Sequence, residues 1–173
     1  MFERIGKTRK YVNILRQTDT FYDLTPTQLE MIASVCSEVR PKEGEIIFEE
    51  NSAGDELYVI ADGEVDIEVT PAMIQPPPTG QPPRALIIAT FRRGHSFGEI
   101  ALVDQGLRTA AARCASKRAH LLIVPRDRLI KLCDNYPELG YALMRNIAAD
   151  LAFKLRNTDL AIREQLVWRP RRT

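Results

Sequence analysis

The side chains best suited to chemistry lie in one short segment, Phe97-Gly98-Glu99-Ile100-Ala101-Leu102, and in Arg108, which follows it after five residues. A carboxylate accepts hydrogen bonds and suits a hydroxyl donor such as a ribose 2′-OH. An arginine presents a forked cation that matches phosphate oxygens. A glycine beside them lets the backbone come close to a ligand. The pattern therefore predicts a site for a ligand that carries both a sugar and an anion.

The neighbouring residues fit the same interpretation. Glu99 to Leu102 predict one helical turn whose N–H groups would point at an anion. Ala101 and Ala110 are small and leave room for a compact ligand. The alternative is a buried ion pair between Glu99 and Arg108 that fastens the loop without any ligand. The order of residue types across the whole segment favours the ligand site.

Residues Phe97–Ala111 closely resemble the phosphate-binding cassette of cyclic-nucleotide-binding domains. This family includes bacterial catabolite activators, cyclic-nucleotide-dependent kinases and nucleotide-gated channels. Lys42–Phe48, Gly54–Ile60 and Gly63–Val65 are similar to the family's first strands and glycine turns, and Arg92–Phe97 is similar to its approach to the cassette. The resemblance implies an α+β fold, a double-stranded β-helix (jelly-roll β-roll) flanked by N-terminal helices and a long C-terminal helix.

The resemblance also implies how a cyclic nucleotide would be held between cassette and barrel. Glu99 would bind the ribose 2′-hydroxyl and Arg108 the cyclic phosphate, with backbone N–H groups around the cassette also facing the phosphate. The implied ligand-binding residues are Gly98, Glu99, Ile100, Ala101, Arg108, Thr109 and Ala110. Thr109 does not separate cAMP from cGMP, because cAMP binders also carry that residue.

Two cassette positions depart from the family pattern. Leu107 stands where proline is usual, and Ala111 stands where Thr or Ser is common. Neither change removes a charge or an essential donor, so we expect binding to be retained.

The resemblance places Thr158 and Asp159 at a lid over the base. Asp159 would accept a hydrogen bond from the adenine amino group or from guanine N1–H and N2–H₂. The alternative is that Asp159 faces solvent, and the sequence leaves both interpretations open.

Three segments must position this site. Residues 1–37 predict helices, with Thr25 as an N-cap, Pro26 at the first helical position and Gln28 completing a capping box. Residues 38–124 predict a β-roll, with the cassette at 97–111 and a hairpin turn at Asp62-Gly63. The expected strands are Ile46–Phe48, Leu57–Ile60, Val65–Val69, Ala85–Ala89 and Leu121–Val124.

Residues 71–83 carry six prolines and cannot form a central strand. They predict a long hairpin loop, which is either a recognition segment or a tolerated surface insertion.

Residues 125–173 predict a hinge, a lid and a basic tail. We expect a helix over Arg126–Asn135 and a longer one from Pro137 to about Val167. The longer helix carries a heptad-like seam that predicts a homodimer. The seam residues are Met144, Ala148, Leu151, Leu155, Thr158 and Ile162. The tail, residues 169–173, either contacts phosphates or is a frayed terminus.

Composition excludes several function classes. The net charge is +1, and 45% of residues are hydrophobic and 27% charged, as in a typical soluble domain. Three separated cysteines, no signal peptide and no bilayer-spanning stretch predict a cytoplasmic protein without a membrane partner. His95 and His120 form no metal motif, and there is no catalytic motif or helix-turn-helix. We therefore expect no metal, cofactor, enzymatic activity or nucleic-acid partner.

The prediction is a stand-alone sensor that binds cAMP or cGMP and signals through movement of its C-terminal helix to an unidentified effector protein. The alternative is a degenerate domain that acts as a dimerisation or protein-docking module without nucleotide. The presence of both Glu99 and Arg108 favours the sensor.

Overall fold

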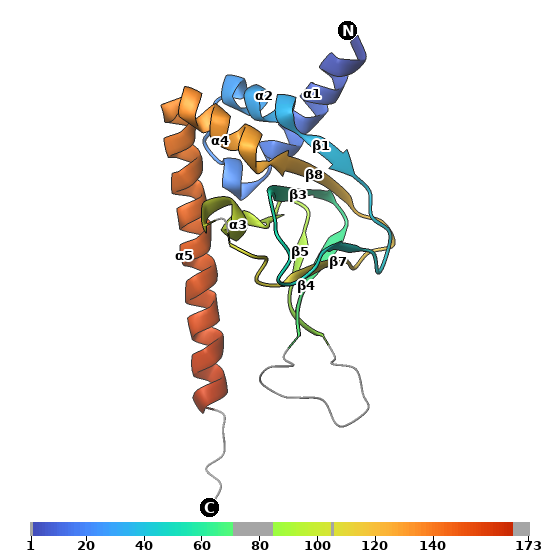
Figure 1. Ribbon diagram of the computed structural model, residues 1–173, viewed down its shortest axis with the longest axis vertical. Helices are drawn as coiled ribbons and strands as arrows, with labels where there is room; N and C mark the ends of the chain where they lie inside the picture. The colour runs from blue at the N-terminus through green and yellow to red at the C-terminus, as the bar shows by residue number, and fades with distance from the viewer. Residues whose placement is uncertain (1, 71–84, 105, 168–173) are drawn as a thin grey trace, which may run out of the picture.

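The computed structural model describes residues 2–70, 85–104 and 106–167 (Figure 1). The predicted proline-rich loop, 71–83, and the basic tail, 169–173, lie outside the described residues. Most of the helices gather at one end of the β-structure, and the last helix runs along its side (Figure 1). The helices are α1 (Phe2–Leu15), the 3-10 helix η1 (Asp19–Phe21), α2 (Pro26–Val35), α3 (Glu99–Asp104), α4 (Arg126–Asn135) and α5 (Pro137–Val167).

The strands of the described residues form two four-stranded antiparallel sheets, with orders β1-β8-β3-β6 and β2-β7-β4-β5. Their bounds are β1 (Ser37–Val39), β2 (Ile46–Phe48), β3 (Glu56–Asp62), β4 (Glu64–Val69), β5 (Leu86–Arg92), β6 (Ser96–Phe97), β7 (Ala111–Cys114) and β8 (His120–Pro125). Two packed antiparallel sheets with flanking helices and a long C-terminal helix confirm the predicted α+β class.

The hairpin predicted at Asp62-Gly63 is wrong. β3 pairs with β8 and β6, whereas β4 pairs with β5 and β7, so the chain crosses here from one sheet to the other. Gly63 has a φ of +87°, and a Cβ atom there would lie 2.6 Å from Ser116 Oγ and 2.8 Å from the Arg118 carbonyl oxygen. The turn needs glycine for this crowding and conformation, but a turn signal does not say which strands will pair.

The helix signals in the sequence are confirmed. Thr25 Oγ1 accepts a hydrogen bond from the Gln28 N–H at 3.3 Å, and Gln28 Oε1 accepts one from the Thr25 N–H at 2.9 Å, which completes the capping box. Both C-terminal helices occupy the predicted ranges. The N-terminal helical segment ends earlier than predicted, because β1 begins at Ser37.

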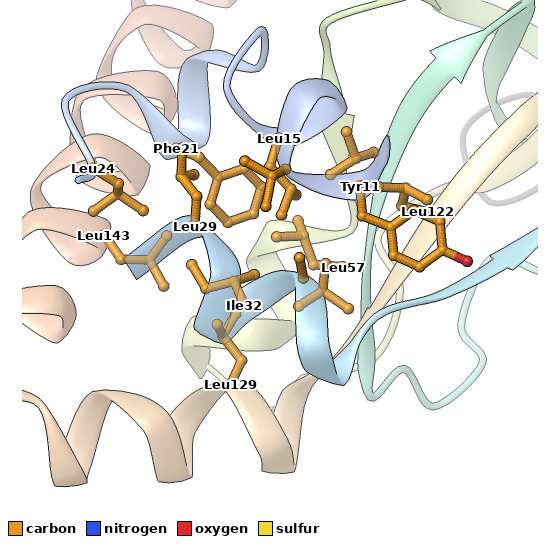
Figure 2. Close-up of a cluster of buried hydrophobic side chains, with 14 of the residues drawn as sticks. Tyr11, Leu15, Phe21, Leu24, Leu29, Ile32, Leu57, Leu122, Leu129 and Leu143 are labelled. Carbon is orange, nitrogen blue, oxygen red and sulfur yellow. The ribbon is translucent and has the colours of Figure 1, made fainter. Parts of the chain in front are cut away.

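The helical end of the molecule holds the larger hydrophobic core. Figure 2 shows side chains from α1, η1, α2, α4 and α5 meeting those of β3 and β8, among them Phe21, Leu29, Leu57 and Leu143. Leu139, Leu143 and Ile147 of α5 are buried in this core, and Leu151 packs against it. Burying a side chain of this size stabilises the fold by about 1.5–3 kcal/mol.

Beyond Leu151, the apolar side chains of α5 are largely exposed. Phe153 and Leu155 are 63% and 64% exposed, and Leu160 and Ile162 are 57% and 50% exposed. The first half of α5 is therefore fixed by the core, while its second half extends past the sheets (Figure 1).

Candidate functional site

Arg108 is the most constrained charged group of the predicted cassette. Its side chain is buried, and its guanidinium donates from Nη1 to the Gly98 carbonyl at 3.0 Å and from Nη2 to the Glu56 carbonyl at 2.8 Å. The guanidinium carbon lies 4.2 Å from the centre of the Phe48 ring. Two carbonyl dipoles and an aromatic face thus hold the cation in place, and each favours a positive charge.

The backbone on either side of Arg108 is fixed by a neighbouring loop. The Arg108 N–H donates to the Ser52 carbonyl at 2.9 Å, and the Asn51 N–H donates to the Arg108 carbonyl at 2.8 Å. A β-bridge between Ala53 and Leu107 extends this pairing. The loop before β3 therefore determines where the arginine enters the protein interior.

Two glycines make room for the guanidinium. Gly98 has a φ of +85°, and a Cβ atom there would collide with Arg108 Nη1 and lie 3.0 Å from the Glu56 carbonyl oxygen. A Cβ atom on Gly54 would collide with the guanidinium as well. The sequence predicted that Gly98 permits a close approach, but not that Gly54 and the Glu56 carbonyl complete the same enclosure.

Within the described part of the chain, Arg108 Nε has no hydrogen-bond partner. Nε is buried and makes no hydrogen bond with any described residue. Burial lowers the pKa of Arg108, while the neighbouring tyrosine and acidic side chains oppose that shift, and arginine remains protonated in proteins. Because a buried donor without an acceptor is unfavourable by about 1–3 kcal/mol, this site has a charge and an unused donor that suit an anion.

Glu99 opens α3 and is almost fully buried. Its Oε1 lies 2.8 Å from Nζ of Lys154 on α5, and the same Nζ lies 2.8 Å from Asp150 Oδ2. Sequence reasoning missed Lys154. The available signal was the spacing of four between Asp150 and Lys154, which places both on one helix face.

The alternative ion pair between Glu99 and Arg108 is not formed. Glu99 pairs with Lys154, and Arg108 donates to two backbone carbonyls, so the two cassette charges have separate partners. Glu99 still acts on Arg108 through space, since its charge is among those that raise the pKa of the guanidinium. The site therefore presents a carboxylate and a cation near one another without mutual neutralisation.

The other predicted cassette residues lie around these two charges. Ile100 and Ala101 are in α3, and the Ile100 side chain is 37% exposed. Thr109 is exposed and Ala110 is buried, directly before β7 begins. The structure thus brings the seven predicted residues into the α3–β7 region.

The predicted lid residues lie in the second half of α5. Thr158 and Asp159 are both exposed. Thr158 Oγ1 donates to the Lys154 carbonyl at 3.0 Å, one turn earlier in the same helix. Lys154, rather than the predicted lid pair, is the α5 residue that reaches Glu99.

The described part of the chain contains neither a candidate metal-binding cluster nor a candidate membrane-spanning helix. No group of three or more His, Cys, Asp or Glu side chains there has the geometry to hold a metal ion. Among the described helices, none has both the length and the hydropathy needed to span a membrane.

Known proteins resemble this chain in sequence and in fold. Residues 38–136 match the family model of the cyclic nucleotide-binding domain, which is more than half of the chain. The chain is 29% identical to the cyclic AMP receptor protein of Thermus thermophilus over 86% of its own length and 62% of that protein. It is 27% identical to a cGMP-dependent protein kinase of Drosophila melanogaster over 80% of its length and 14% of the kinase.

A solved structure extends the likeness to nearly the whole fold. The crystal structure of a cyclic nucleotide-binding domain from Methylobacillus flagellatus superimposes with a TM-score of 0.73 at 21% identity, covering 92% of this chain and 84% of that one. At this identity the likeness concerns the fold. The segment shared with this chain is only part of each curated relative. It makes up 62% of the cyclic AMP receptor protein and 14% of the kinase.

Proposed function

This chain belongs to the cyclic nucleotide-binding domain family, and on that premise we propose that it is a non-catalytic sensor of cAMP or cGMP. One observation carries the proposal. Arg108 is a buried cation with an unpartnered Nε, enclosed by Gly54 and Gly98 and close to a separately paired Glu99. A fixed cation beside a carboxylate suits a ligand with one phosphate and one sugar hydroxyl.

The roles follow from the chemistry of each group. Arg108 neutralises the cyclic phosphate, and the backbone at Thr109 and Ala110 lies beside it. Glu99 accepts a hydrogen bond from the ribose 2′-hydroxyl. Gly98 and Glu56 use only part of the hydrogen-bonding capacity of the guanidinium, and this supports a role for Arg108 in binding an anion.

The choice between cAMP and cGMP depends on residues outside this core of the site. Thr109 is exposed beside Arg108, where its hydroxyl is available to a phosphate or a guanine. Thr158 and Asp159 are exposed on α5 and would reach the base after α5 closes over the cassette. Asp159 favours guanine, because a carboxylate accepts from both N1–H and N2–H₂.

The signal is movement of α5. In this proposal, bound phosphate orders the cassette, and α3 then shifts the part of α5 beyond Leu151. A homodimer through the exposed face of α5 is a second part of the proposal, supported by the exposed Leu155 and Ile162. The effector protein is unidentified.

Thermal unfolding with cAMP, cGMP and 5′-AMP tests the proposal. A specific ligand at a hundredfold excess over its dissociation constant stabilises the fold by about 2.7 kcal/mol, so a cyclic nucleotide should raise Tm clearly and 5′-AMP should not. If neither cyclic nucleotide shifts Tm at millimolar concentration, the sensor is excluded and the docking module without nucleotide takes its place.

A further inference from the structure

Lys154 connects the candidate ligand site to the part of α5 that the core does not fix. It lies one turn beyond Leu151, which is the last of the described α5 side chains packed on the helical core. Its Nζ contacts Glu99 Oε1 and Asp150 Oδ2, each at 2.8 Å, and lies 5.2 Å from the centre of the Phe91 ring of β5. One side chain thus joins α5, α3 and the second sheet.

The contact with Lys154 leaves one carboxylate oxygen of Glu99 available to accept a hydrogen bond. The hydrogen bond that Glu99 receives from the described residues goes to Oε1, and a carboxylate has two oxygens with about four acceptor positions. Lys154 therefore fixes the orientation of the carboxylate while Oε2 keeps its acceptor capacity. A ribose hydroxyl and Lys154 are compatible partners of Glu99, not competitors.

Charge also favours keeping Lys154 in place when an anion binds. Glu99 is buried, and a buried carboxylate without a counter-ion is strongly unfavourable. A hydroxyl group cannot supply that counter-charge, and a cyclic phosphate would add a second negative charge nearby. Burial alone would lower the pKa of Lys154, but the carboxylates of Glu99 and Asp150 outweigh it and raise that pKa, so the ammonium stays charged at neutral pH.

We propose that Lys154 is a positioning residue for the ligand: it holds the Glu99 carboxylate for the ribose 2′-hydroxyl, and it docks α5 on the occupied cassette. This inference rests on the proposed cyclic-nucleotide function and adds the residue that couples the site to α5. By linkage, a ligand that is held better when α5 is docked must itself favour the docked α5 to the same extent.

The test compares cAMP with 2′-deoxy-cAMP, which lacks the hydroxyl that Glu99 would accept; if thermal unfolding selects cGMP, cGMP and 2′-deoxy-cGMP replace them. Affinities are measured by calorimetry for the unmodified protein, K154M, K154R and R156M. Arg156 is exposed on the same helix and gives a matched loss of charge away from the cassette. Circular dichroism and Tm establish that each variant is folded.

The unmodified protein should prefer cAMP over the deoxy analogue by about tenfold or more, the scale of a hydrogen bond to a charged group. K154M should reduce that preference to within about twofold, since an unpositioned carboxylate no longer distinguishes the two ligands. K154R should retain most of the preference, and R156M all of it. In an E99Q background, K154M should have no further effect on the preference, because the two residues act as one unit.

A second measurement follows α5 directly. Ligand should slow amide hydrogen exchange across residues 152–160 in the unmodified protein and in R156M, but not in K154M. The inference is overturned if K154M keeps the full preference for the 2′-hydroxyl, even when its affinity for both nucleotides falls, because Lys154 would then act only as a distant charge. Failure of the unmodified protein to bind either nucleotide is a different result, which overturns the proposed function itself.

Discussion

Gly54 and Arg108 lie so close together that a Cβ atom on Gly54 would overlap the Arg108 guanidinium. The two residues are 54 positions apart in the sequence. They are neighbours in space, because the loop before β3 is hydrogen-bonded to the segment that leads into β7. A residue with no evident chemistry therefore controls the position of the charge that the proposed ligand needs.

Gly54→Ala should lower cyclic-nucleotide affinity by about tenfold or more, since displacing one charge-assisted partner is worth at least ~1.5 kcal/mol. The fold should survive, because the colliding atoms belong to a side chain rather than to the backbone, and Gly54 does not have a positive φ. Calorimetry gives the affinity and thermal unfolding gives Tm.

Gly6→Ala, in α1 with open space around it, is the matched control and should leave affinity unchanged. Unaltered affinity in Gly54→Ala would show that the enclosure does not position Arg108.

Arg108→Ala should weaken cyclic-nucleotide binding by about 2–4 kcal/mol, because it removes both the counter-charge of the phosphate and its donors. The affinity of Arg108→Lys should lie between that of the unmodified protein and that of Arg108→Ala. Lysine keeps the positive charge, but it cannot donate to the Gly98 and Glu56 carbonyls at once as the planar guanidinium does. Titration calorimetry measures both variants. Arg92→Ala, at an exposed arginine paired with Glu64, is the control for a lost positive charge. An affinity unchanged by Arg108→Ala would mean that this buried arginine is structural.

The sequence predicted the elements of this fold better than their pairing. Regular patterns and caps located α2, α4 and α5, because helix signals are local in the chain. β7, by contrast, is Ala-Ala-Arg-Cys, a segment with little intrinsic strand preference, and it forms because β2 and β4 flank it on both sides. Strand partners are set by tertiary packing, which is also why the signal at Asp62-Gly63 predicted the wrong connection.

The candidate site shows the same division. Glu99 and Arg108 were identified from residue type and spacing within one short segment. Lys154 and Gly54 were not, since their importance arises only when α5 and the loop before β3 fold back onto the cassette. These contacts join residues that are far apart in the chain and depend on the tertiary structure. Local patterns in a single sequence do not reveal them.

Acid should weaken the fold partly through Glu38, the middle residue of β1. Its carboxylate lies 2.8 Å from His120 Nε2 and 3.3 Å from Lys10 Nζ. Burial tends to raise the pKa of Glu38, but these hydrogen bonds and charges outweigh it and lower the pKa below its usual value of 4.5. A carboxylate with a depressed folded pKa stabilises the fold above its unfolded pKa, and that contribution is lost as the pH falls through the folded value.

Glu38→Gln should therefore lower Tm by about 1–3 °C at pH 7, the scale of a partly exposed ion pair in a domain of this size. The difference in Tm between the variant and the unmodified protein should shrink as the pH falls from 5 to 3. Thermal unfolding across that range measures it, and subtracting the two profiles removes the contributions of other carboxylates. A difference that stays constant with pH would show that Glu38 acts by packing and not by charge.

The exposed half of α5 should mediate self-association. Of the predicted seam, Met144 and Leu151 pack against the core of this chain, which leaves Leu155 and Ile162 exposed for another copy. Leu155→Asp combined with Ile162→Asp should convert a dimer into a monomer, because each change would place a carboxylate in an apolar interface. Sedimentation equilibrium at several concentrations, with and without cyclic nucleotide, measures the mass. Asn157→Asp, an exposed position off the seam, adds a negative charge without entering the interface and should remain dimeric. A monomer at high concentration for the unmodified protein in both conditions would exclude the dimer and leave α5 to act on a different protein.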